Sequence, residues 1–288
     1  MAINWSYKNS EDILHTREQG GVPFLSFKAL EGTGLVTNGF STRLGGASKG
    51  KFATMNFSYS RKDEPADVLE NFTRMARALG VERDRMVVSY QTHTVNVRRV
   101  TEEDAGKGVI RDRDYRDVDG LITNVPGLTL VTFYADCVPL YLVDTRNRAI
   151  GLSHSGWRGT VNRMGRVTMD AMREAFGTEP EDLVVCIGPS ICMDCFEVGE
   201  EVVEAFQAAF DRGYWDELSR PNGKPGKYQL DLWKANEIIF REAGVPQNQI
   251  HTTNICTMCN SDYLFSHRRT GEERGNLGAF LCLDWMEH

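Results

Sequence analysis

The sequence lacks both a long hydrophobic run and a targeting segment. No stretch approaches the roughly 18 consecutive apolar residues that indicate a membrane-spanning helix. Residues 1–10 have neither the basic start nor the apolar stretch of a signal peptide. No repeat of roughly 20 to 50 residues and no low-complexity tract occurs. We therefore expect a soluble, cytoplasmic, globular protein with no membrane partner.

The sequence also lacks an excess of positive charge. It has 33 Lys and Arg residues against 40 Asp and Glu residues, a formal net charge of −7. Nucleic-acid-binding domains instead carry clustered positive charge that neutralises phosphates. The composition therefore argues against a nucleic-acid partner, whereas 41% hydrophobic and 25% charged residues are typical of a globular protein.

Cysteines are absent from the first 136 residues, and the total of seven is odd. A chain of this size needs no disulfide framework, so free thiols or metal ligands are expected. Two CxxC pairs occur, Cys192 with Cys195 and Cys256 with Cys259, but 60 residues separate them. Zinc ribbons separate their pairs by about 15 to 20 residues. Partly buried free cysteines are therefore our first interpretation, and a shared structural zinc is the alternative.

The length of 288 residues allows one large domain or two small ones. Strand-like runs alternate with helical patterns, which indicates an α/β or α+β class. The predicted strands are Gly34–Thr42, Met86–Tyr90, Val95–Val100, Leu128–Thr132, Leu140–Asp144, Ala149–His154 and Leu183–Ile187. The predicted helices are Val68–Leu79, Val161–Phe176 and Leu230–Ala243. Ser219–Lys227 contains two prolines and two glycines and is predicted to be a surface loop within a single domain.

Three residues of metal-ligand type stand at strand ends: His93, Cys137 and His154. If they converge, they can bind one zinc ion and leave a fourth position for water or substrate, as catalytic zinc requires. The alternative is a buried cysteine and two hydrogen-bonded histidines. No HExxH motif and no His-x-His pair occurs, so metalloprotease and multicopper oxidase chemistry are poorly supported.

Anion and base binding have weaker signals. Gly45–Phe52 has the spacing of a phosphate-binding P-loop, but Phe52 replaces the magnesium-binding Ser or Thr. Arg43 and Arg158, each beside glycines, are candidate phosphate ligands, with an ordinary surface role as the alternative. Tyr134 lies next to the candidate ligands and could stack on a planar base.

A series of motifs occurs in one order between Leu35 and Leu283 and resembles the YfiH-like family. These proteins are labelled laccase-domain or polyphenol oxidase proteins and are now regarded as purine nucleoside phosphorylases with adenosine deaminase activity. The motifs are NGFSTRLGG (38–46), QTH (91–93), ADCVP (135–139), HSGWRG (154–159), IGPS (187–190), EVG (197–199), LD (230–231), CT (256–257) and FSHRR (265–269).

The resemblance implies a fold and a chemistry. The expected fold is α+β: one domain over residues 1–288, a layered α-β-β-α sandwich with mixed sheets and a variable segment at 1–34. The expected cofactor is zinc on His93, Cys137 and His154, with copper able to occupy the site in vitro. The expected partners are purine nucleosides and phosphate. Phosphate is the co-substrate that cleaves adenosine, inosine, guanosine or S-methyl-5′-thioadenosine, and adenosine is also deaminated to inosine. We expect a monomer or weak homodimer.

With that chemistry, Arg43 and Arg158 are predicted to bind phosphate, Gln91 and Tyr134 to contact substrate, and Asp136 to carry a proton beside the metal. One departure is Asn276, where many relatives carry an arginine, so a cation is missing at that position.

Two other interpretations use the same residues. In a metal-free cysteine hydrolase, Cys137 would be the nucleophile and His93 or His154 its base. In a non-catalytic nucleoside-binding protein, the site would bind purines without turnover.

Overall fold

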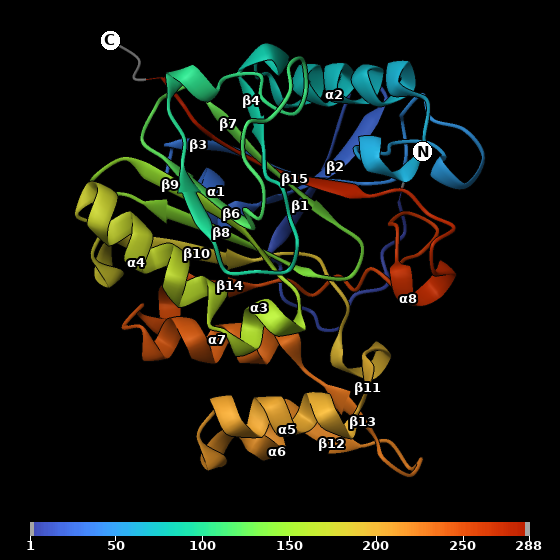
Figure 1. Cartoon of the computed structure of the whole chain (residues 1–288), viewed down its shortest axis with the longest axis vertical. Coiled ribbons are helices and arrows are strands. Elements are labelled where there is room, and N and C mark those ends of the chain that lie inside the picture. Colours follow the sequence, from blue (N-terminus) through green and yellow to red (C-terminus); the bar gives the residue numbers. More distant parts are fainter. Residues whose placement is uncertain (1–2, 286–288) are drawn as a thin grey trace.

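The computed structural model describes residues 3–285 and has a layered architecture in which two mixed sheets lie between helices (Figure 1). The first sheet has the order β1 (Leu14–Gln19), β2 (Val22–Phe27), β3 (Val36–Ser41), β15 (Leu277–Leu283), β7 (Thr129–Tyr134) and β4 (Met86–Val88). The second has the order β14 (Ile250–Thr252), β10 (Leu183–Ile187), β8 (Val138–Asp144), β9 (Ala149–Ser155), β6 (Gly120–Thr123) and β5 (Val97–Arg99). The short strands at the sheet edges pair in parallel with their neighbours: β4 with β7 in the first sheet, and β14 with β10 and β5 with β6 in the second. The longer strands, such as β8 and β9, pair antiparallel.

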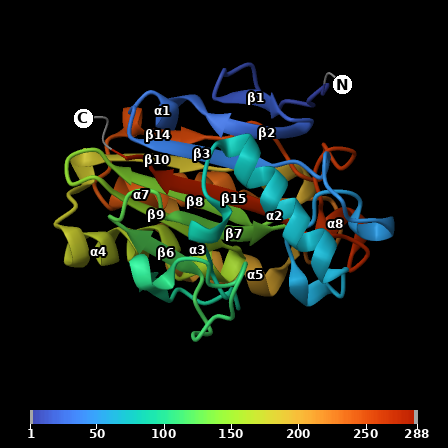
Figure 2. The ribbon, with the colours of Figure 1, turned by 90° about the horizontal axis from the view of Figure 1, so that it is seen from above.

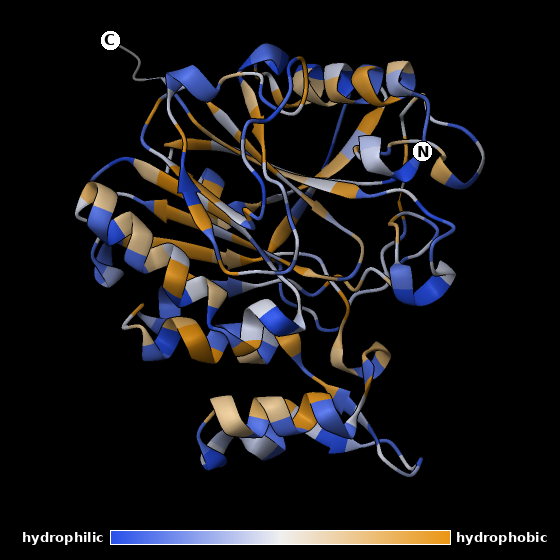
Figure 3. Cartoon of the chain, viewed as in Figure 1, coloured by the Kyte–Doolittle hydropathy of each residue, from blue (hydrophilic) through white to orange (hydrophobic). Residues whose placement is uncertain are grey.

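Large buried side chains fill the space between the two sheets. Phe27 and Phe40 of the first sheet belong to the same core cluster as Tyr141 and Leu152 of the second. Apolar strands and more hydrophilic loops are evident in Figure 3. Strands buried on both faces read as continuous apolar runs, which explains why β8 is apolar along most of its length.

Helices cover the outer faces of both sheets (Figure 1), and the helix over the first sheet is seen from above in Figure 2. On the first sheet, α2 (Pro65–Leu79) packs through Val68, Phe72 and Met75 and ends at Gly80 in the left-handed conformation. The second sheet is covered by α3 (Trp157–Val161), α4 (Met164–Phe176) and α7 (Leu232–Glu242). The helices α1 (Lys28–Glu31) and α8 (His267–Thr270) have only four residues each. The α+β sandwich with mixed sheets is therefore confirmed.

A small third sheet stands apart at one end of the molecule (Figure 1). Its order is β11 (Glu197–Gly199), β13 (Lys227–Leu230) and β12 (Ser219–Pro221), and it carries α5 (Glu200–Ala209) and α6 (Trp215–Leu218). The prediction of a loop over Ser219–Lys227 was therefore wrong, because only residues 222–226 lie between the paired strands β12 and β13. Pro221 is tolerated because β12 is an edge strand.

A further difference from the predicted elements concerns a helix boundary. The helix expected at Val161–Phe176 begins at Met164 as α4, and the separate helix α3 precedes it, because Arg163 adopts the left-handed conformation with φ of 62° between the two. Residues 1–34, whose variability stays a prediction, contain β1 and β2, and β2 pairs with β3. Within residues 3–285, no helix combines the length and apolar character needed to cross a membrane.

Candidate metal centre and active site

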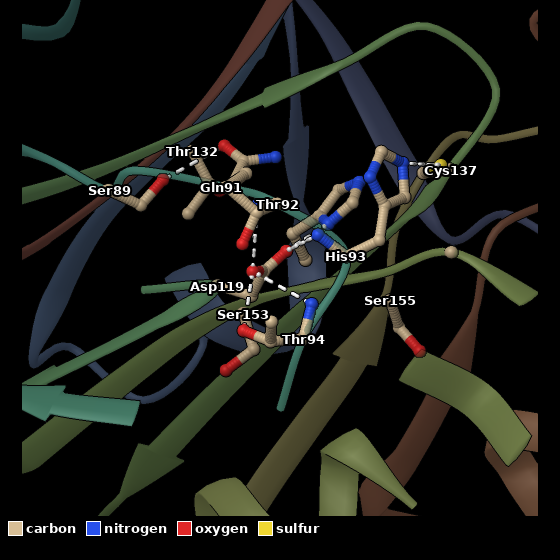
Figure 4. Close-up of polar contacts among 12 residues, drawn as sticks. Ser89, Gln91, Thr92, His93, Thr94, Asp119, Thr132, Cys137, Ser153 and Ser155 are labelled. Atoms are coloured by element: carbon tan, nitrogen blue, oxygen red, sulfur yellow. Dashed lines mark hydrogen bonds and ion pairs between the residues drawn. The ribbon is translucent and has the colours of Figure 1, made fainter. Parts of the chain in front are cut away.

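His93, Cys137 and His154, the His-Cys-His cluster, are brought together by three different elements. His93 lies in the loop after β4, Cys137 in the turn between β7 and β8, and His154 on β9. Their ligand atoms all lie within 4.8 Å of one another, and the Cys137 Sγ lies 4.0 Å from the His93 Nε2 (Figure 4). Tetrahedral zinc with ordinary bond lengths would separate such a sulfur and nitrogen by about 3.6 Å. The geometry and the donor types therefore fit one zinc ion.

Backbone conformation and strand register fix these ligands. Antiparallel pairing of β8 and β9 places Pro139 opposite His154. Cys137, two residues before Pro139, therefore lies next to the His154 ring. His93 and Asp136 have φ of 66° and 92°, a left-handed conformation that is strained for residues other than glycine. Such strain persists where the surrounding structure enforces it, often at functional sites.

Asp119 connects two members of the cluster and is a residue that the sequence analysis missed. Its fully buried carboxylate accepts hydrogen bonds from the backbone N–H of His93 at 3.0 Å and from those of Thr92 and Thr94 (Figure 4). The same carboxylate accepts one from the His154 Nδ1 at 2.9 Å. This bond places the proton on Nδ1 and leaves Nε2 free to bind a metal. Asp119 therefore orients one ligand through its side chain and another through its backbone.

Charges within the cluster stabilise one another. Burial alone would raise the pKa of the Cys137 thiol, but His154 and His93 outweigh that effect and lower it to about 6. Burial would likewise lower the pKa of His154, yet Cys137 and Asp119 raise it to about 9. Burial favours the neutral acid of Asp119, but the hydrogen bond from His154 keeps its pKa below the ordinary value. A thiolate, the form that binds metal, is therefore favoured at neutral pH.

Two cavities of about 280 Å³ and about 390 Å³ meet at this cluster. His93, Cys137, Arg61 and Arg274 line both of them. The first cavity, of about 280 Å³, also has aromatic walls: Tyr59, Tyr90, Phe133 and Tyr134. The second cavity, of about 390 Å³, is also lined by Trp157, Arg158, Phe196 and Arg268. Positive side chains and aromatic rings therefore lie beside the candidate metal position.

Arg61 and Arg274 form a pair of cations at this junction. Arg274 is 8% exposed, and burial followed by repulsion from Arg61 lowers its pKa to about 10. The Asn276 side-chain oxygen accepts hydrogen bonds from both guanidinium groups, at 3.1 Å from the Arg61 Nε. Asn276 stands where many relatives carry an arginine, and its side chain holds two other arginines at the site. An anion between them would relieve their mutual repulsion.

Arg43 is not brought to either cavity. Its guanidinium donates to the backbone oxygens of Ala53 at 3.0 Å and Ser261 at 3.1 Å. It also lies over the Phe265 ring, 4.6 Å from its centroid. Asp136 does reach the second cavity, but its two carboxylate oxygens accept hydrogen bonds from the Thr257 hydroxyl and the Arg268 backbone, both at 2.6 Å. These contacts engage both groups in holding loops together, and their predicted roles stay predictions.

The other predicted substrate residues line the cavities with their polar groups partly engaged. The Gln91 side-chain amide bonds to the backbone of Phe133 in both directions, at 2.8 and 2.6 Å. Tyr134 is buried and donates its hydroxyl to the Ser153 carbonyl, while its ring contacts His154. Arg158 remains exposed beside the second cavity, with its guanidinium over the Trp157 ring.

A second group of metal-type ligands lies outside this site. Cys192, Cys195, Cys256 and Cys259, the cysteine cluster, have sulfur atoms within 4.8 Å of one another and could hold a metal ion. The structure keeps all four as free thiols, as the first interpretation expected, and it also brings them together as the alternative of a shared metal site requires. The reason is topological: β10 and β14 are parallel neighbours, so the loops that follow them lie side by side despite their distance in sequence.

Comparisons with known proteins agree with this geometry. Residues 37–284 match the family model described as multi-copper polyphenol oxidoreductase laccase. A protein of Bacteroides thetaiotaomicron named purine nucleoside phosphorylase is 37% identical, covering 88% of this chain and 93% of its own. A protein named adenosine deaminase RL5, from an unknown prokaryotic organism, is 34% identical, covering 86% and 93%.

Among solved structures, the crystal structure of Bacillus licheniformis hypothetical protein YfiH is similar at a TM-score of 0.88 and 29% identity. The match covers 95% of this chain and 100% of that one. The sequence match and the shared fold lead to one assignment: the chain belongs to the laccase-domain, or YfiH-like, family.

Proposed function

We propose that this chain is a zinc-dependent purine nucleoside phosphorylase that also deaminates adenosine to inosine. Its substrates would be adenosine, inosine, guanosine and S-methyl-5′-thioadenosine, each cleaved with phosphate to the free base and a ribose 1-phosphate derivative. The observation that carries the proposal is the convergence of the His-Cys-His cluster with two arginines at the meeting point of two cavities. The names of the relatives support the same chemistry.

Zinc held by the His-Cys-His cluster would act as a Lewis acid that polarises a substrate oxygen or activates water. In phosphorolysis, the bond between the base and the ribose breaks and a phosphate oxygen bonds to the same ribose carbon. Arg61 and Arg274 would hold that phosphate, because guanidinium groups bind phosphate oxygens through paired N–H donors. Their charge is fixed in place before the reaction, which is the condition for effective electrostatic stabilisation.

Aromatic side chains of the first cavity would bind the purine. Tyr90 and Phe133 line this cavity, and the Arg113 guanidinium lies over the Tyr90 ring at 4.5 Å from its centroid. Flat rings of this kind stack on purine bases. Asp136, with both oxygens engaged by Thr257 and Arg268, would position the adjacent metal ligand instead of carrying a proton.

The proposal is tested by separating the products formed from adenosine by the purified protein, with and without phosphate. We expect adenine and ribose 1-phosphate only when phosphate is present, and ammonia under both conditions. Inosine should accumulate without phosphate, whereas with phosphate part of it should be cleaved further to hypoxanthine, because inosine is also a proposed substrate. Hydrolysis would instead release adenine without phosphate, so phosphate-independent adenine would contradict a phosphorylase. Failure to form inosine would contradict the deaminase activity alone.

The Arg61→Ala variant tests whether phosphate binds to the pair Arg61 and Arg274 or to Arg43, the residue predicted from the sequence. We expect the phosphate KM to rise roughly 10-fold or more, because a hydrogen bond to a charged group contributes about 1.5–3 kcal/mol. Deamination, which needs no phosphate, should change much less. The matched control is Arg43→Ala, which removes a guanidinium bonded only to protein carbonyls and stacked on a ring and should leave the phosphate KM unchanged. The reverse result would return the phosphate role to Arg43.

A further inference from the structure

The four sulfur atoms of the cysteine cluster lie close enough to one another to bind a single metal ion. Both pairs have the C-x₂-C spacing that structural zinc sites use. Four thiolates at about 2.3 Å from one zinc ion lie about 3.8 Å apart, which agrees with sulfur atoms that are all within 4.8 Å of one another. An iron–sulfur cluster interposes inorganic sulfide and so keeps its four thiolates farther apart. We propose that these four cysteines bind a structural zinc ion, separate from the His-Cys-His cluster.

Local structure is consistent with a closed, structural site. Cys192 and Cys256 are buried, whereas Cys195 is half-buried and Cys259 is exposed. The Cys192 backbone N–H donates to the Cys256 sulfur at 3.3 Å, a contact that stabilises a thiolate. All four positions are occupied by protein ligands, so no position remains open for substrate.

The position of the cysteine cluster indicates which part of the structure a bound zinc ion would stabilise. One pair lies in the loop between β10 and the small third sheet, and the other in the segment between β14 and α8. Thr257 follows Cys256 and donates to Asp136, and the Ile191 backbone N–H, next to Cys192, donates to the Asp136 carbonyl at 3.0 Å. The zinc would therefore fix both loops that hold Asp136, the neighbour of the ligand Cys137.

Zinc stoichiometry tests this inference without any measurement of enzyme activity. The full chain is purified with a reductant, dialysed against metal-free buffer and analysed for metals by mass spectrometry. We expect two zinc ions per chain in the wild type and one in Cys195→Ser/Cys259→Ser. His93→Ala should also retain one, and the combination of all three substitutions none. Cys282→Ala, which removes a thiol outside both clusters, should retain two.

Different outcomes separate the two metal sites. A single zinc that is lost with the cysteines but kept in His93→Ala would support this inference and contradict only the zinc of the proposed function. Full zinc content in Cys195→Ser/Cys259→Ser would overturn the inference, as would iron at this position. So would a count below seven alkylatable thiols in the denatured, unreduced chain, since that would indicate a disulfide. If the double variant does not fold, Cys259→Ser alone, at the exposed ligand, serves the same comparison.

Discussion

Cys137→Ala is expected to remove the zinc of the His-Cys-His cluster and to eliminate both nucleoside reactions together. One of three protein ligands is lost, and the two remaining histidines cannot hold the ion at the same affinity. Changing merely a residue that orients a ligand typically costs about 10- to 100-fold in metal affinity or activity. We therefore expect a loss of more than about 100-fold in zinc affinity and in kcat/KM for both reactions. Metal analysis and product chromatography of the same preparation would measure both.

The matched control for this substitution is Cys282→Ala, because Cys282 is a buried thiol on β15 that belongs to neither ligand cluster. It should retain zinc and activity. Chelator treatment of the wild type distinguishes the cysteine-hydrolase alternative, which the lowered pKa of the Cys137 thiol would also serve. Full activity of metal-free wild type, abolished by alkylation of Cys137, would favour the hydrolase and contradict the zinc mechanism. Tight purine binding without turnover would instead favour the non-catalytic alternative.

Asp119→Asn is expected to weaken zinc binding by about 10- to 100-fold while the chain remains folded. The amide has one acceptor oxygen and one donor nitrogen, so it cannot accept from the His154 ring and the three backbone N–H groups at once. The His154 ring then loses its fixed orientation and His93 its backbone support. Competition with a chelator of known affinity would measure the change, and circular dichroism would verify the fold.

Asp144→Asn is a suitable control for the Asp119 substitution. Asp144 is also fully buried and also accepts backbone hydrogen bonds, from Arg146 and Asn147, but it ends β8 at the strand terminus away from Cys137. We expect it to lower the free energy of unfolding without changing zinc affinity. Equal zinc affinities in the wild type and Asp119→Asn would show that the carboxylate does not position the ligands. An equal loss in both variants would attribute the effect to general destabilisation.

The sequence predicted the convergence of His93, Cys137 and His154, because ligand-type residues are rare and these stand at strand ends, and the family resemblance then favoured them as metal ligands. The chain separations of the other site residues explain why they were missed. Asp119 lies 35 residues before His154, and its local sequence resembles any polar turn before a strand. Arg61 meets Asn276 across 215 residues. Only the folded sheets show which of many surface arginines face a cavity, so Arg43 could not be separated from Arg61 by residue type.

The strands also divide into those that their own sequence predicts and those that only the fold explains. The long strand β8 was found because burial on both faces leaves an almost continuous hydrophobic run. The three-residue strands β11 and β12 were not, because pairing with β13 stabilises them and their own composition does not. The sequence did not show that the two CxxC pairs lie together, because the third sheet and α7 occupy the chain between them. Only the parallel pairing of β10 with β14 brings the two pairs side by side.

The His-Cys-His cluster takes its members from both halves of the sandwich. His93 follows a strand of the first sheet, His154 lies on a strand of the second, and Cys137 occupies the turn that crosses from one to the other. A close-packed interior transmits small changes of volume instead of absorbing them. Any substitution that widens or narrows the space between the sheets would therefore alter the spacing of the ligands. If the cluster binds zinc as proposed, the zinc affinity would therefore report how well the protein interior is packed.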